Sequence, residues 1–132
     1  MSAPRARHDA WFLQAEDDLR WGRDSLAARH FAQACFIAQH VGEKALKALA
    51  FQRGFDVVKS HSIARIAGEL DIDGEILQVA TTLDLYYISA RYPDALPDGV
   101  APFEHFTERM AAEALRFAER IVERVRSERG PR

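Results

Sequence analysis

The placement of proline constrains the fold of this 132-residue chain more than any other feature of its sequence. No proline occurs between Arg5 and Tyr92, and Pro93, Pro97 and Pro102 then follow within ten residues of one another. Proline removes a helical hydrogen bond and disfavours helical geometry in the residue before it, so this cluster predicts a loop. The long segment without proline is free to form helices.

Apolar residues recur at helical spacing on both sides of this loop. The pattern predicts helices over about residues 8–27 and 29–53 (ending at Gly54), a short helix capped by Ser60, a fourth helix capped by Asp73 that stops before Pro93, and a last helix that begins between Phe103 and Thr107. No segment alternates apolar and polar residues as a half-buried strand must. We therefore expect an all-α fold, an up-and-down antiparallel bundle of four long helices plus one short helix joined by short loops, as a single domain over residues 1–132.

Composition narrows the class of protein. Hydrophobic residues make up 48% of the chain and charged residues 29%, which is typical of soluble globular proteins. No window of about 18 residues lacks charge, and the amino terminus has arginines but no apolar run, so we expect no membrane span, no secretory signal and a cytoplasmic location. A net charge of −2 creates no field that would draw the chain onto nucleic acid. The single cysteine, Cys35, is expected to be a buried thiol.

The common catalytic and cofactor motifs are absent from the sequence. It contains no phosphate-binding glycine loop, no dinucleotide-binding glycine motif, no H-E-x-x-H and no C-x-x-C. None of its five histidines lies four residues from another, so neither a metal site nor a cofactor is expected. No catalytic residue is predicted, although a Ser-His-Asp triad stays open because its members meet only in the fold.

Two local clusters are ambiguous when each is taken alone. Lys44 and Lys47 lie three residues apart on neighbouring rows of one helix, where the favoured interpretation is a solvated surface with an ion pair between Glu43 and Lys47. His61, with a serine on each side, starts the short helix. A histidine there more often caps or packs than catalyses, although a neutral imidazole would be useful beside a phosphate.

The third cluster runs from Tyr86 to Asp94, where a predicted helix meets the proline loop. In one interpretation, Arg91 binds a phosphate or carboxylate while a tyrosine ring stacks on a base. In the other, Arg91 bonds the carbonyl groups at its own helix end and pairs with Asp84 or Asp94. Local sequence favours neither.

Taken together, these segments resemble the HEPN domain family. The resemblance spans nearly the whole chain and rests on the order and spacing of Ala15–Leu19, Ala38–Gln39, Glu43–Ala48, His61–Ser62, Leu83–Tyr87 and Arg91–Asp94. It implies a helical bundle that commonly dimerises, accompanies minimal nucleotidyltransferases and binds nucleotides or RNA. Carried onto this chain, it implies a ligand-binding set of Lys44, Lys47, His61, Tyr87, Arg91, Tyr92 and Asp94. The chain departs from the family at His40 and Gly42, where relatives often carry glutamine and alanine.

Some branches of the family are ribonuclease toxins, whose signature is an arginine followed after four to six residues by a histidine. Arg91 has no histidine at that distance, and the nearest one downstream is His105. His61 precedes the fourth helix and Arg91 ends it. At 1.5 Å per residue, the two ends of this helix are on the order of 27 Å apart. His61 comes closer to Arg91 only if the short helix folds back or a second chain supplies His61. We therefore expect no histidine-based RNA cleavage.

The favoured function is a HEPN-like module that binds a nucleotide or polyphosphate and acts with a small nucleotidyltransferase. The alternative is a toxin-type ribonuclease with a divergent active site. We also expect a homodimer, because large apolar side chains lie at helix ends or in loops where they can cover a partner. These side chains are Trp21, Phe51, Phe55 and Phe103.

Overall fold

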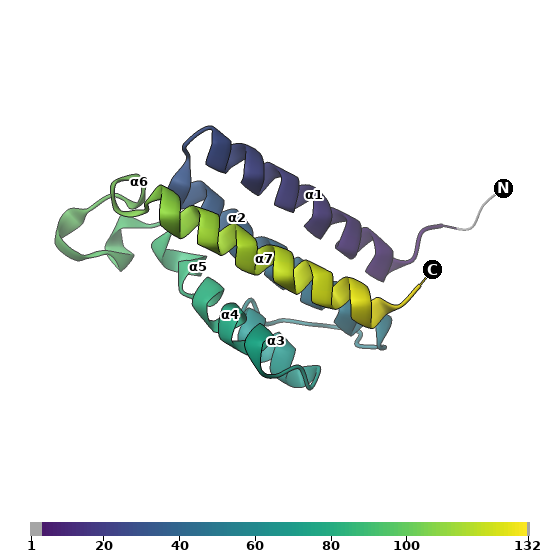
Figure 1. Ribbon diagram of the computed structural model, residues 1–132. Coiled ribbons are helices and arrows are strands. Elements are labelled where there is room, and N and C mark those ends of the chain that lie inside the picture. The colour runs from purple at the N-terminus through teal and green to yellow at the C-terminus, as the bar shows by residue number, and fades with distance from the viewer. Residues whose placement is uncertain (1–3, 132) are drawn as a thin grey trace.

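The computed structural model describes residues 4–131, and within that range every regular element is a helix or a helical turn (Figure 1). In chain order the elements are α1 (Arg7–Ala27), α2 (Phe31–Gln52), α3 (Ile63–Glu69), α4 (Glu75–Asp84), α5 (Tyr86–Ser89), the 3₁₀ turns η1 (Pro93–Ala95) and η2 (Pro97–Gly99), α6 (Pro102–His105) and α7 (Glu108–Arg129). The described helices include none with the length and apolar character needed to span a bilayer.

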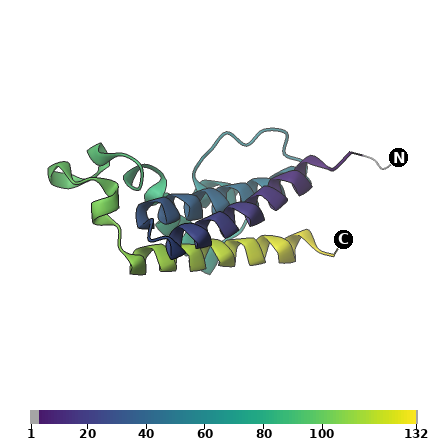
Figure 2. The ribbon, with the colours of Figure 1, turned by 90° about the horizontal axis from the view of Figure 1, so that it is seen from above.

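The chain reverses its direction from α1 to α2, from α2 to α4, and again before α7 (Figure 1). The central helix is α2, which contacts α1, α3, α4 and α7. The proline-rich segment lies at the end of the bundle where α1 ends and α2 begins, and the start of α1 and the end of α7 lie at the opposite end (Figure 2). The predicted all-helical bundle with alternating chain direction is confirmed.

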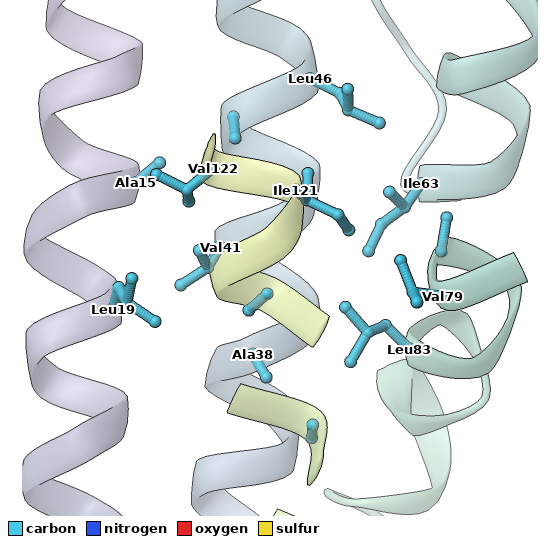
Figure 3. Packing of buried hydrophobic residues seen from close by; sticks show 14 of the residues in the cluster. Ala15, Leu19, Ala38, Val41, Leu46, Ile63, Val79, Leu83, Ile121 and Val122 are labelled. Carbon is cyan, nitrogen blue, oxygen red and sulfur yellow. The ribbon is translucent and has the colours of Figure 1, made fainter. Parts of the chain in front are cut away.

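The hydrophobic core surrounds α2, which has 15 buried residues among its 22. Figure 3 shows Val41 and Leu46 of α2 in the same core as Ile121 of α7, Ile63 of α3 and Leu83 of α4. All five side chains are at most 1% exposed, and burying each contributes about 1.5–3 kcal/mol. The core therefore joins the α3–α4 pair to the three long helices.

Cys35 also lies in this core and is fully buried, as expected. Burial raises the pKa of its thiol to about 12. A neutral, inaccessible thiol is chemically inert.

The fourth helix of the predicted bundle is divided into α4 and α5. α4 has 10 residues and α5 only 4, whereas α1, α2 and α7 have 21 or 22. Leu85, between α4 and α5, keeps helical dihedral angles (φ −61°, ψ −25°), so the chain continues in nearly the same direction. The connections on either side of the α3–α5 segment are also longer than predicted. The proline loop includes the short helical turns η1, η2 and α6, because proline is well suited to the first turn of a helix.

Two predicted helix caps are also wrong. The cap of α3 is Ser62, whose Oγ accepts a hydrogen bond from the Arg65 amide, while Ser60 instead accepts one from the Ser62 amide. The residue before α4 is Gly74, with a φ of +69°, rather than Asp73. At the last helix, Thr107 is the cap and α7 begins one residue beyond the predicted range, at Glu108.

Candidate functional site

The candidate site depends on the way α3 folds back along α4. Asp84, at the end of α4, accepts hydrogen bonds from the backbone amides of Ile63 (2.8 Å) and Ala64 (3.0 Å) and from the Ser62 hydroxyl (2.8 Å). Amides in the first turn of a helix have no partner within the helix, so this carboxylate both satisfies them and complements the helix dipole. The start of α3 therefore lies beside the end of α4, and His61 lies beside α5.

Tyr87 of α5 connects His61 and Arg91. The His61 ring stacks on the Tyr87 ring, with centroids 5.4 Å apart and an interplanar angle of 13°. The Cζ atom of Arg91 lies 4.6 Å from the centroid of the same ring. The predicted separation of His61 and Arg91 by the length of a helix is therefore wrong, because the folded-back α3 returns His61 to the end of α4 and α5.

Two further rings surround the Arg91 guanidinium. Its Cζ atom lies 4.6 Å from the ring centroid of Phe36 and 5.0 Å from that of Tyr92, and its Nε donates a hydrogen bond to the Tyr87 carbonyl at 2.8 Å. The predicted bond to its own helix end is thus confirmed. Asp84 is occupied by α3, and no carboxylate among residues 4–131 forms an ion pair with Arg91, so its charge is free to meet an anion.

A buried carboxylate, Glu43 of α2, also contacts His61. Its Oε2 accepts a hydrogen bond from Lys47 Nζ at 2.8 Å and lies 3.2 Å from His61 Nδ1, while its Oε1 lies 3.8 Å from His40 Nδ1. Burial raises the pKa of Glu43, but the neighbouring His40, Lys47 and His61 outweigh this effect and lower the pKa to about 2. Glu43 is therefore ionised at neutral pH.

The predicted ion pair between Glu43 and Lys47 is present, but the predicted solvated surface is wrong, because both side chains are only 7% exposed. The ammonium group of Lys47 lies 5.7 Å from the ring centroid of Trp11, which shows that α1 covers this part of α2. The positive charge of Lys47 is neutralised by Glu43 and is not available to a ligand.

The structure brings together four of the seven residues in the predicted ligand-binding set: His61, Tyr87, Arg91 and Tyr92. With Phe36 they form a surface group that we call the Arg91 cluster. Lys47 is linked to the Arg91 cluster only through Glu43 and His61. Lys44 is directed to α1, where its Nζ lies 2.5 Å from Asp18 Oδ2, and Asp94 is exposed in η1.

Three residues of this region, all on α2, were not among the predicted site residues: Phe36, His40 and Glu43. They lie on one face of α2, at helical spacing, and His40 contacts both the Phe36 ring (4.3 Å between centroids) and the Tyr87 ring (6.2 Å). This helical spacing can be seen in the sequence. The sequence does not show which element packs against this face of α2, because the approach of α5 depends on tertiary packing. In the range that the structure describes, no group of three or more potential ligand side chains is arranged to hold a metal ion.

The fold and the site define a small helical bundle that carries an arginine among aromatic rings at its surface. The chain belongs to the HEPN domain family, which matches residues 8–128.

Solved structures agree with this assignment. TT1696 from Thermus thermophilus is 38% identical, with a TM-score of 0.84, over 92% of this chain and 97% of that one. ST0689, an archaeal HEPN homologue, is 36% identical, with a TM-score of 0.81, over 94% and 98%. A HEPN domain protein from Thermotoga maritima, TM0613, is 28% identical, with a TM-score of 0.70, over 88% and 93%. Comparison with curated proteins gave no match.

Proposed function

We propose that this chain is a nucleotide- or polyphosphate-binding module that acts with a small nucleotidyltransferase. The observation that carries the proposal is the Arg91 guanidinium, which lies among three aromatic rings with a backbone carbonyl as its hydrogen-bond acceptor. A guanidinium has five donor hydrogens in a fixed plane, so its two terminal nitrogens can bind two oxygens of one phosphate group.

The neighbours of Arg91 supply the other contacts that a nucleotide needs. Tyr92 is 49% exposed, and a base can stack on its ring. The His61 side chain is 57% exposed and offers a hydrogen bond beside the phosphate. These groups suit a ligand that combines negative charge with an aromatic base.

Family membership supports the partner in this proposal, because members of the HEPN family are found beside minimal nucleotidyltransferases. Co-expression with a small nucleotidyltransferase encoded next to its gene, followed by co-purification through a tag on one chain, tests the association. Copurification in a constant molar ratio supports it, and separation of the two chains at low ionic strength contradicts it.

Replacing Arg91 tests the ligand site. We expect Arg91→Lys to weaken ADP binding by at least about tenfold, because an ammonium cannot form the paired contact of a guanidinium. Isothermal titration calorimetry measures the affinity, and circular dichroism melting shows whether the fold is intact.

The matched control is Arg7→Lys. Arg7 also lies on an aromatic ring, with its Cζ 3.6 Å from the centroid of Phe51, but at the other end of α2. ADP affinity should be unchanged in this variant. Equal effects of the two substitutions, or a loss of affinity at Arg91 that only parallels a loss of stability, would assign Arg91 a structural role.

One observation favours the second candidate, a ribonuclease with a divergent site. His61 and Arg91 contact the same ring, so an imidazole able to transfer a proton lies near a cation able to stabilise a phosphate. The decisive assay compares RNA cleavage by wild type, His61→Ala and His105→Ala after stringent removal of contaminating nucleases. Activity that is lost only in His61→Ala would establish the ribonuclease, and equal traces in all three proteins would exclude it.

A further inference from the structure

His61 is held at three points by groups from two elements, α2 and α5. Its main-chain carbonyl accepts a hydrogen bond from Gln39 Nε2 at 2.9 Å, its ring stacks on Tyr87, and its Nδ1 lies 3.2 Å from Glu43 Oε2. Gln39 and Glu43 are one helical turn apart on α2, and both are buried. One of them therefore contacts the backbone of His61 and the other contacts the ring.

Anchoring of the chain does not account for the contact with the ring. The backbone here is already attached to α2 by Gln39 and to α4 by the hydrogen bonds that Asp84 accepts from the amides of Ile63 and Ala64. The carboxylate of Glu43 contacts the ring and not the backbone, so it acts on the orientation and the protonation pattern of the imidazole.

The contact also determines which ring nitrogen carries hydrogen. An ionised carboxylate is only an acceptor, so the His61 nitrogen that faces it must be a donor. In the neutral imidazole the other nitrogen, Nε2, is then an acceptor. The His61 side chain is more than half exposed, and its ring stacks on the Tyr87 ring that the Arg91 guanidinium also contacts.

We propose that Glu43 is a positioning residue for His61, which it holds in the Nδ1–H tautomer so that Nε2 accepts a hydrogen bond from a ligand whose anionic group is bound by Arg91. The ligand in this inference rests on the proposed function, whereas the tautomer of His61 is inferred from the structure alone. A nucleotide has suitable donors in its ribose hydroxyl and base amino groups. If RNA is the substrate, the same Nε2 is the atom that would accept a proton.

The tautomer can be measured without any ligand. Two-bond ¹H–¹⁵N correlation spectra distinguish the two tautomers of a neutral imidazole, and the His61 signals are assigned by their loss in His61→Gln. At about pH 9, where an ordinary histidine is neutral, we expect the Nδ1–H form of His61 to exceed the Nε2–H form by at least about tenfold. An Nε2–H majority in the wild type would overturn the inference.

The test variant is the double substitution Glu43→Met with Lys47→Met, because removing the pair together avoids leaving a buried ammonium without its partner. We expect the Nδ1–H preference of His61 to fall by at least about fivefold, with both tautomers present. The matched control is Gln39→Met, which removes the contact with the His61 backbone and leaves the ring contact in place. An unchanged tautomer in the double variant, or an equal change in the control, would overturn the inference.

ADP binding then tests whether the orientation matters to a ligand. The double variant and His61→Gln are each expected to weaken ADP binding, and combining all three substitutions should weaken it no further than His61→Gln alone. Additive losses would show that Glu43 acts on the ligand independently of His61, which contradicts the positioning role. A wild type that does not bind ADP would contradict the proposed nucleotide ligand, and the tautomer measurement would still decide the positioning role.

Discussion

At the scale of single residues, Glu43 and Lys47 illustrate how burial changes the meaning of a familiar pattern. A glutamate four residues before a lysine usually forms an exposed helical ion pair worth about 0.3–0.5 kcal/mol. Here α1 and the His61 segment cover the pair, and the carboxylate has His40, Lys47 and His61 as neighbours. The same two residues therefore contribute to the stability of the fold and to its dependence on pH.

We expect acid to remove the stabilising contribution of Glu43. Its pKa is lowered from 4.5 to about 2 in the folded protein, so the carboxylate stabilises the folded state fully above about pH 4.5, and that stabilisation is lost as the pH falls towards 2. The contribution is about 3 kcal/mol, since each pKa unit corresponds to about 1.4 kcal/mol. Urea unfolding at about pH 7 and pH 2 should give a smaller pH dependence, by about this amount, for Glu43→Met/Lys47→Met than for the wild type. Identical pH dependences of the two proteins would contradict this assignment.

At the scale of elements, Asp84 joins α3 to α4. We expect Asp84→Ala to reduce the free energy of unfolding by about 2–3 kcal/mol, because it leaves the first amides of α3 and the Ser62 hydroxyl without their acceptor. The substitution should also release His61 from Tyr87. Chemical denaturation measures the first effect, and the ring-current shift of the His61 protons measures the second.

Asp73→Ala is the control for this prediction. Asp73 is exposed and lies two residues before α4 without capping it, so its replacement should change the free energy of unfolding by less than about 0.5 kcal/mol. A larger effect at Asp73 than at Asp84 would restore Asp73 as the important cap and contradict the structural assignment.

Gly42 is required by the packing between α2, α3 and α7. A Cβ atom at this position would lie 2.8 Å from Ile63 Cδ1 and 3.1 Å from Ile121 Cδ1, and both isoleucines are fully buried. At Gly68 in α3, a Cβ atom would have no neighbour within 4 Å. Because alanine is the better helix former at both sites, the difference between the two substitutions isolates the crowding.

We expect Gly68→Ala to raise the free energy of unfolding by about 0.5 kcal/mol and Gly42→Ala to be less stable than Gly68→Ala by about 1–3 kcal/mol. Thermal and urea unfolding of both variants measure the difference. Equal stabilisation by the two alanines would show that the core next to Gly42 can accommodate a methyl group without crowding.

At the scale of the whole molecule, the structure separates the four side chains predicted to cover a partner into two pairs. Phe51 contacts Arg7 and the Trp11 ring, and Phe55 packs against the core, so both are used within the chain. Trp21 and Phe103 remain 56% and 73% exposed. Aromatic side chains are enriched at the interfaces between protein chains.

The homodimer therefore stays a prediction, now with Trp21 and Phe103 at its contact surface. We expect light scattering at high micromolar concentration to give the mass of two chains, and we expect Trp21→Gln with Phe103→Gln to shift the equilibrium towards the mass of one. The double variant Phe51→Leu with Phe55→Leu is the control, because it changes internal packing and not the exposed rings. A single-chain mass for the wild type at these concentrations would contradict the dimer.

The sequence alone determined the features that depend on neighbours within a few residues. Helical hydrogen bonds join residues four apart, so apolar spacing and proline placement were enough to predict the all-helical bundle, the approximate extents of α1, α2 and α7, and the buried thiol of Cys35. The HEPN resemblance rests on motifs of the same local kind. It also pointed to His61, Tyr87, Arg91 and Tyr92, which do lie together.

Only the tertiary structure decided which of these motifs meet. The reversal between α3 and α4 depends on the positive φ angles of Asp71 and Gly74, and on the bonds that Asp84 makes to a segment about 20 residues earlier. That reversal places His61 beside Tyr87 and Glu43, contrary to the separation expected along a straight helix. Burial of the pair formed by Glu43 and Lys47 likewise depends on α1, a separate helix. Such contacts join residues far apart in the chain, and no periodicity along the sequence encodes them.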